Sequence, residues 1–506
     1  MRPPARLPRL RGPARTRAAI RAVKGYGRLV WLPFAVLIIS FGALSHSPVL
    51  FGAAVVWSVI MAFFGARIPH MVFACFLQAT SALVGCAYLG FYHYYPGGVA
   101  DPELAPIAAA AVLLATLVVC TTYWLLVRAE KPGDARLGES FRMLKLSPTH
   151  MFILLLIIFS PEWLRLSTAT SSTGGFRQII THIMTFRLVL YALFFINALR
   201  ANKRRIYWML LAISFWIVLP MSVTGHAGWS GVVILALMLY AGSLAFPIAK
   251  GGARLTPAGV TVAVVGVLFL AGFGLIWEGG LKGTWRSTLA RTEGDLSMVQ
   301  TLSAFSDDGK SVVQNFELSR SLEVLAGRMS TGEGFSSLVL TNVPKAIPYA
   351  RGERATAAIQ NLLPRILFPN KKDLGGDSWL VRRYAQVAAA GDEEGSSIGL
   401  GYVPEMYVDY GVGAIIGESV VLGLLFGFGM LLFRRISGSG DLSNTAFSLV
   451  VYTTFITPDA GLTKMVGTVF YEIAIFSAMI FLVNRFLYIA HRAPEPKGRQ
   501  LVAAPA

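Results

Sequence analysis

Long apolar runs fill most of the chain, and short polar links separate them. Each run has about 16 to 24 residues, which suits a helix crossing a bilayer, because only a helix or a closed barrel satisfies its own backbone in lipid. The pattern predicts an all-α, polytopic helical membrane protein with about twelve transmembrane helices, at 29–44, 49–64, 71–93, 104–127, 150–166, 179–199, 206–224, 228–246, 257–277, 411–433, 443–458 and 467–490.

Three of these runs are less typical of membrane-spanning helices. The first two are short and are joined by Ser45-His46-Ser47-Pro48, so they also fit a hairpin within the membrane. The eleventh is interrupted by Pro458 and Gly461, which disfavour a continuous helix.

One long segment, 278–410, breaks the apolar pattern. It carries fourteen Lys/Arg and sixteen Asp/Glu, so it is polar and nearly balanced in charge. No alternation typical of strands occurs in it, and we expect several short helices. Asp377 fits the N-cap of a helix over 378–390, and Ser311–Gly327 places leucines on one helical face, suited to lying on a surface.

The distribution of charge predicts the orientation. The chain has a net charge of +18, and with the N-terminus inside, the inner links and both tails hold 27 Lys/Arg against five acids. The outer links 45–48, 94–103 and 225–227 hold no Lys/Arg. This is the positive-inside pattern, so we expect no nucleic-acid partner. The predicted parts are a basic cytoplasmic tail (1–28), spans one to nine (29–277), a large periplasmic loop (278–410), spans ten to twelve (411–490) and a second cytoplasmic tail (491–506).

Few charged residues lie inside predicted spans, and two of them, Arg187 and Glu418, could face each other. Arg187 lies about 9 Å inside the outer end of the sixth span, and Glu418 lies about 10 Å inside that of the tenth, at 1.5 Å per residue. A charge in lipid usually faces a cavity or a partner. Arg187 therefore either binds substrate in an outward-facing cavity or pairs with Glu418.

A basic turn lies within the long loop. Arg365, Lys371 and Lys372 are held by two prolines, which fix φ and stiffen the turn. A rigid basic turn at a membrane surface suits a pyrophosphate, and Arg328 and Arg354 upstream could join it. The alternative is a solvated loop that rests on lipid phosphates.

Two carboxylates precede the tenth span. Glu405 and Asp409 are four residues apart and would share a helical face, with Tyr407 between them. Either could accept a proton from a sugar hydroxyl, and Tyr407 could stack on a sugar ring. The alternative is an aromatic belt with acids at a helix N-terminus.

Motifs for metal chemistry do not occur. The three cysteines all lie in apolar runs, and there is no CxxC, HxxxH or HExxH. We expect neither a bound metal nor a cofactor.

The loop motifs together resemble a known family, the Wzy-type O-antigen and exopolysaccharide repeat-unit polymerases. The resemblance covers roughly residues 180–435, although His226 stands where the family often has an Arg. It is carried by Gly327-Arg328-Met329-Ser330, Val343-Pro344-Lys345-Ala346-Ile347-Pro348, Leu363-Pro364-Arg365, Phe368-Pro369-Asn370-Lys371 and Glu405-Met406-Tyr407-Val408-Asp409-Tyr410-Gly411-Val412-Gly413.

The resemblance implies a metal-independent glycosyltransferase of the bacterial cytoplasmic (inner) membrane. It would move a growing glycan from polyprenyl pyrophosphate to an incoming lipid-linked repeat unit on the outer side, in the synthesis of O-antigen, capsule or exopolysaccharide. Glu405 and Asp409 would be catalytic, and Arg365, Lys371, Lys372, Arg328, Arg187 and Tyr407 would bind substrate. Its partners would be the polyprenyl-pyrophosphate-linked oligosaccharide, membrane lipid and a chain-length regulator.

Three alternatives stay open. An O-antigen ligase uses the same chemistry, but that family relies on a loop histidine and 278–410 contains none. Another lipid-linked-sugar glycosyltransferase would have its large loop first, whereas the first outer link here has four residues. A polysaccharide flippase or transporter belongs to a different class, in which so long a loop is uncommon.

Overall fold

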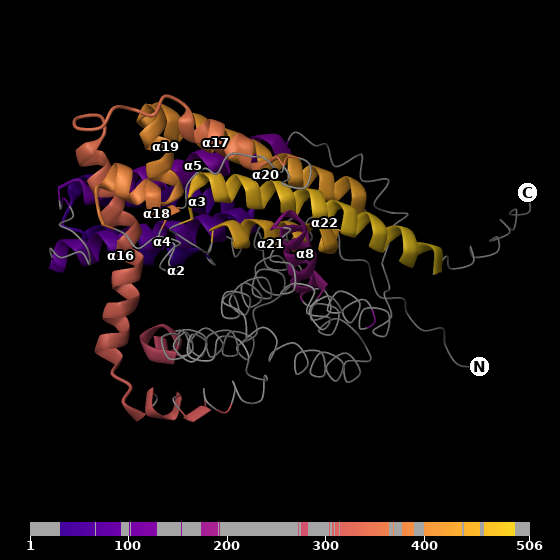
Figure 1. Cartoon of the computed structure of the whole chain (residues 1–506), viewed down its shortest axis with the longest axis horizontal. Helices are drawn as coiled ribbons and strands as arrows, with labels where there is room; N and C mark the ends of the chain where they lie inside the picture. The colour runs from indigo at the N-terminus through magenta and orange to yellow at the C-terminus, as the bar shows by residue number, and fades with distance from the viewer. Residues whose placement is uncertain are drawn as a thin grey trace, which may run out of the picture.

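The computed structural model describes a large part of the chain, and its regular elements there are all helices (Figure 1). The described residues are 31–65, 67–92, 101, 103–128, 153, 174–190, 192, 272, 275–281, 303, 306, 307, 309–312, 314–363, 368, 377–388, 399–437, 440–455 and 460–490. Within these residues there is no strand, as the sequence predicted.

Five helices are long and apolar enough to cross a membrane: α3 (Pro48–Gly65), α4 (Pro69–Tyr92), α5 (Ala105–Arg128), α20 (Val412–Ser437) and α22 (Leu462–Ala490). Their lengths and composition agree with the predicted membrane protein. Shorter helices are α2 (Leu32–Leu44), α8 (Gly174–Thr185) and α21 (Gly440–Phe455). The 13 residues of α2 span about 20 Å, which is less than the hydrocarbon core.

The predicted spans match these helices at both ends of the chain. The first four correspond to α2–α5 and the last three to α20–α22, while the sixth overlaps α8 and the residues after it. One boundary was wrong: α22 begins at Leu462, five residues before the predicted start of the twelfth span. The predicted end of the eleventh span lies among residues 456–459, outside the described part of the chain. The spans predicted at 150–166, 206–224, 228–246 and 257–277 and both tails lie wholly or almost wholly outside the described residues, so the total of twelve spans stays a prediction.

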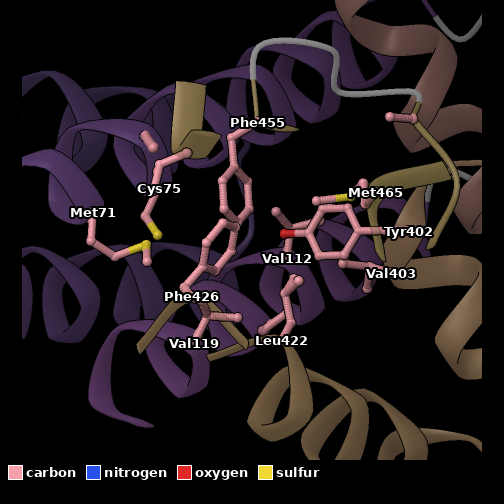
Figure 2. Packing of buried hydrophobic residues seen from close by; sticks show 14 of the residues in the cluster. Met71, Cys75, Val112, Val119, Tyr402, Val403, Leu422, Phe426, Phe455 and Met465 are labelled. Atoms are coloured by element: carbon pink, nitrogen blue, oxygen red, sulfur yellow. The ribbon is translucent and has the colours of Figure 1, made fainter. Parts of the chain in front are cut away.

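Small residues let α5 and α20 pack closely. A Cβ added at Gly423 would lie 2.8 Å from the Val119 carbonyl oxygen, and one added at Gly427 would lie 2.6 Å from Leu126 Cδ2. Glycines four residues apart commonly allow such an approach between membrane helices. Around this contact, Phe426 stacks on Phe455 at 5.7 Å between ring centroids, within the apolar cluster of Figure 2.

Helix α16 (Leu318–Asn342) runs across the end of the bundle and contacts α4 and α5 (Figure 1). The helices meet at Gly85, where a Cβ would lie 2.7 Å from the Met329 carbonyl oxygen. The helix predicted over Ser311–Gly327 was therefore wrong in its bounds. The chain is not helical at 315–317, and α16 continues to Asn342 because its polar second half is buried against α4.

The remaining loop helices are α17 (Glu353–Asn361), α18 (Asp377–Leu380), the π-helix η4 (Val381–Ala385) and α19 (Tyr402–Tyr410). They lie at the end where α4 finishes and where α5 and α20 begin. The helix predicted over 378–390 is shorter, because Gln386 takes a left-handed conformation at φ 58° and ends it. Asp377 is its first residue rather than its N-cap.

Candidate functional site

A short buried helix, α19, forms the centre of the site. Glycines with positive φ stand at both ends, Gly401 at 91° and Gly411 at 66°. Each sits where other residues would be strained, and a Cβ at Gly411 would also lie 2.9 Å from the Tyr349 hydroxyl oxygen. These two turns set α19 apart from α20, so the predicted re-entry into the membrane is a separate helix followed by a tight turn.

Tyr402 fixes the first turn of α19 in the apolar core (Figure 2). Its ring meets Phe455 edge-on, with centroids 6.1 Å apart. Burial raises the pKa of the Tyr402 hydroxyl well above its usual value. This contact joins α19 to α21, and α19 also packs against α20 and α22.

Glu405 is the most unusual group in α19. Its side chain is only 1% exposed, and within the described residues neither carboxylate oxygen has a hydrogen-bond partner. The carboxylate faces Gly461, where a Cβ would collide with Oε1, and the amides of Leu462 and Thr463 at the N-terminus of α22. These amides lie close enough to favour the ionised form, although neither makes a hydrogen bond of good geometry.

The pKa of Glu405 is raised to about 8, first because burial disfavours the charged form. The nearby Asp377 raises this pKa further, while Arg354 and the two amides at the start of α22 lower it. A carboxyl group with a pKa near the working pH is suited to accept and return a proton.

Asp409 has a structural role, which differs from the role of Glu405. It is fully buried, and its two oxygens accept hydrogen bonds from the backbone N–H groups of Arg354 (3.0 Å) and Ala355 (2.8 Å), in the first turn of α17. A carboxylate there satisfies exposed N–H groups and favours the helix dipole. The predicted pair of carboxylates thus shares one helix but not one role, because Asp409 positions α17.

Basic and aromatic side chains surround the start of α17. The Glu353 carboxylate accepts hydrogen bonds from Arg354 (3.1 Å) and Arg383 (3.2 Å). Both guanidinium groups lie over the Trp379 ring, at 5.6 Å and 4.9 Å from its centroid. Arg354 is buried and Arg383 is about 40% exposed, so the cluster presents positive charge beside a partly exposed indole.

The sequence reasoning named Arg354 but missed Arg383. Its position four residues after Trp379 was the available signal, since residues four apart on a helix lie on one face. It also missed Lys464, whose Nζ lies 3.9 Å from Asp377 Oδ2 near the start of α22.

Tyr407 lies to one side of this cluster. It is half-buried, its hydroxyl donates to the Val343 carbonyl oxygen at 3.4 Å, and its ring is 6.1 Å from that of Tyr349. Burial, together with Tyr349, raises its pKa to about 12. The contacts of Tyr407 in this structure are with the segment between α16 and α17, and its stacking on sugar stays a prediction.

The predicted basic turn falls largely outside what is described. Arg365, Lys371 and Lys372 are not among the described residues, and of Arg328 only the backbone, within α16, is described. The chain leading to the turn is anchored on α22, because Asn361 Nδ2 donates to the Thr463 carbonyl oxygen at 3.0 Å. Their assignment to pyrophosphate stays a prediction.

Arg187 and Glu418 do not form the pair that the sequence left open. The charged groups that act on Glu418 are Asp409 and Glu405. Arg187 is half-buried beside Phe186, which packs against α22.

Near Arg187, a different polar contact joins α8 to α22. His182 Nδ1 lies 3.8 Å from Glu472 Oε1, and Thr453 donates to Glu472 Oε2 at 2.7 Å. Across the part of the chain that the structure describes, no group of three His, Cys, Asp or Glu side chains could hold a metal ion.

Comparison with known proteins shows which family the chain belongs to. Residues 66–441, which make up more than half of the chain, match a family described as a domain of unknown function (DUF8712). The chain belongs to the DUF8712 family. The DUF8712 region contains Glu405, Asp409 and the arginine cluster, whereas Gly461 and α22 follow it. No curated protein and no solved structure matches the chain.

Proposed function

We propose that the chain is an oligosaccharide repeat-unit polymerase of the bacterial cytoplasmic membrane. In this proposal it crosses the membrane about twelve times with both termini inside, and the loop helices lie in the periplasm. Its substrates are polyprenyl-pyrophosphate-linked oligosaccharides. The observation that carries the proposal is Glu405, a buried carboxyl group with no hydrogen-bond partner among the described residues, at the end of an apolar bundle and beside a basic and aromatic cluster.

The reaction needs one proton acceptor and one cationic surface. The acceptor sugar's hydroxyl oxygen attacks the anomeric carbon of the growing glycan, and a glycosidic bond forms. The bond from that carbon to the pyrophosphate oxygen breaks, and the pyrophosphate leaves with the electron pair. Glu405, ionised, takes the hydroxyl proton, for which a raised pKa makes it a stronger base.

Positive charge stabilises the departing pyrophosphate. Arg365, Lys371 and Lys372 are the predicted donors, and Arg383 adds a partly exposed guanidinium group beside Trp379. An arginine can hold two phosphate oxygens at once, and the indole face suits a sugar ring. No metal or cofactor enters this scheme, and each step uses side chains of the chain itself.

A test in cells uses chain length as its readout. Deleting the gene should leave surface glycan of a single repeat unit, and wild-type protein should restore long chains on a gel. Glu405→Gln should not restore them at normal protein level on an immunoblot, whereas Glu323→Gln, an exposed acid on α16, should.

Two outcomes would favour the alternatives. If the deletion removes surface glycan altogether and lipid-linked repeat units accumulate on the inner leaflet, the chain is a flippase. If polymer still forms but is no longer joined to its final carrier, the chain is a ligase.

A further inference from the structure

The exposed side of α17 carries large apolar side chains at its C-terminal end. Ile359 is 65% exposed, and Leu363, which follows the last turn, is 39% exposed. The two are four residues apart, so they lie on the same side of the helix. The other exposed residues of the last two turns, Thr356 and Gln360, carry no charge. Neither the DUF8712 match nor the proposed chemistry accounts for this apolar end.

One stripe of residues on α22 holds the end of α17. Asn361 Nδ2 donates to the Thr463 carbonyl oxygen at 3.0 Å, and the Tyr471 hydroxyl donates to the Leu362 carbonyl oxygen at 3.2 Å. A Cβ added at Gly467 would lie 2.6 Å from Asn361 Nδ2, so the glycine leaves room for this side chain. Thr463, Gly467 and Tyr471 follow one another at intervals of four and therefore share one side of α22.

This contact places the end of α17 beside a helix that is long and apolar enough to cross the membrane. The candidate span in α22 begins at Leu462, and Gly467 lies five residues, or about 8 Å, further along it. Nearby on α22, Phe470 is 40% exposed, as expected for a side chain that faces lipid. Backbone groups at such a depth need partners within the protein, and the Tyr471 hydroxyl is the donor for the Leu362 carbonyl group.

The polarity of the exposed surface changes along α17. At the first residue, the Glu353 carboxylate accepts a hydrogen bond from Arg383, whose guanidinium group lies over the partly exposed Trp379 ring. Six residues, or about 9 Å along the helix, separate Glu353 from Ile359. Guanidinium groups next to lipid phosphates, indoles at the boundary and aliphatic side chains in the hydrocarbon are the usual order across a membrane surface.

We propose that α17 inserts its C-terminal end into the bilayer beside α22. Ile359 and Leu363 contact lipid hydrocarbon, Trp379 lies at the boundary, and Arg383 lies among the phosphate groups. Whereas the proposed function places the loop helices in the periplasm, α17 is partly embedded. It follows that Arg383 lies at the depth of a lipid-linked pyrophosphate, and this consequence alone rests on the proposed function.

The first experiment measures the surroundings of single labelled positions. Ile359→Cys and Leu363→Cys carry a small environment-sensitive fluorophore in the full-length chain. Val421→Cys, at a position that is 60% exposed within the candidate span of α20, is the lipid control, and Ser319→Cys, exposed on α16, is the water control. Wild type, with its three buried cysteines, is the blank.

Each labelled variant is reconstituted in liposomes of phosphatidylcholine and phosphatidylglycerol. One quencher is iodide on both sides of the membrane, and the other is a nitroxide on the lipid acyl chain. Iodide should quench positions 359 and 363 about fivefold less than position 319, because an anion does not enter hydrocarbon. The nitroxide lipid should quench both positions as it quenches position 421.

Two results would overturn the insertion. Quenching of positions 359 and 363 by iodide as at position 319 would place the end of α17 in water. Quenching by neither reagent would mean that protein, such as a second copy of the chain, covers this side of α17. Neither result depends on the proposed function, because no transfer reaction is measured.

The second experiment tests whether α22 sets the depth of α17. Gly467→Ala displaces Asn361 from the Thr463 carbonyl group, and Tyr471→Phe removes the donor to the Leu362 carbonyl group. Each change should raise iodide quenching at position 363 about threefold, since a carbonyl group without a donor is costly in hydrocarbon.

Gly417→Ala is the matched control, because a Cβ at Gly417 would meet nothing within 4 Å. It should leave quenching at position 363 unchanged, and the label at position 421 should stay in lipid in all three variants. Unchanged quenching at position 363 in both Gly467→Ala and Tyr471→Phe would refute the role of α22. Polymerisation with position 359 in water would sink this inference alone, whereas insertion without polymerisation would sink the proposed function alone.

Discussion

Asp409→Ala should destabilise the protein rather than merely inactivate it. The substitution removes the acceptors of the N–H groups of Arg354 and Ala355, of which the first is buried and the second half-buried. Hydrogen bonds to a charged group are worth about 1.5–3 kcal/mol each. Removing the buried charge recovers part of this free energy. We therefore expect the free energy of unfolding to fall by about 3 kcal/mol.

The loss should appear as a lower thermal midpoint. At roughly 2–4 °C per kcal/mol for a large domain, the midpoint of the full chain in detergent should fall by about 6–12 °C. Asp409→Asn keeps one acceptor and should lose about half as much. Asp307→Asn is the matched control, because that side chain is 78% exposed and pairs with the exposed Lys310, so the midpoint should stay within about 1 °C.

Limited proteolysis can locate the part of the chain that Asp409→Ala destabilises. Cleavage within α17 should accelerate in Asp409→Ala, because its first turn loses the group that holds it. An unchanged midpoint and an unchanged cleavage rate, together with lost activity, would refute the positioning role and return Asp409 to direct chemistry.

Four further predictions concern the proposed chemistry and the topology of the chain. Transfer should rise about tenfold per pH unit below about 8 and level off above it, because Glu405 acts ionised and its pKa is raised to about 8; a flat profile from pH 6 to 9 would exclude it as the base. Gly461→Ala should abolish transfer with little loss of protein, since the added Cβ collides with Glu405 Oε1, and wild-type rates would contradict the contact. Arg365→Ala should cost about 3–4 kcal/mol of transition-state stabilisation, a hundredfold or more in rate, with partial rescue by Arg365→Lys; long chains from the alanine variant would rule out its role. A cysteine at position 319 should react with an impermeant maleimide from outside the cell and one at 135–140 should not, and the reverse pattern would invert the topology.

Much of the fold was predictable where a local pattern determines it. The apolar runs located α3, α4, α5 and α20 to within a few residues, because membrane helices are recognised by length and composition alone. The helix that carries Glu405 and Asp409 was predicted from residues within one turn of each other.

The roles of those two acids were not predictable, because their neighbours are distant in the sequence. Asp409 caps a helix that begins some 55 residues earlier, and Glu405 faces a glycine some 55 residues later. No spacing motif encodes such contacts. They arise from the way α17, α19 and α22 converge.

The full extent of α16 was not predictable from the sequence, for a different reason. Its buried side chains include Ser330, Glu333, Ser336 and Ser337, and Ser330 and Glu333 lie against Gly85 of α4. A search for hydrophobic periodicity treats such positions as exposed. Because the interface between α16 and α4 is polar, the sequence pattern assigned this part of α16 to a polar loop.

Transfer by the purified chain tests the central claim most directly. The full-length protein is reconstituted in liposomes with radiolabelled lipid-linked repeat units at pH 8, and the products are resolved by length. Wild type and Glu323→Gln should build ladders of increasing length and release polyprenyl pyrophosphate, while Glu405→Gln should leave the label in single units. Ladders from Glu405→Gln at the wild-type rate would contradict the role of Glu405, and single units from every variant would contradict the polymerase itself.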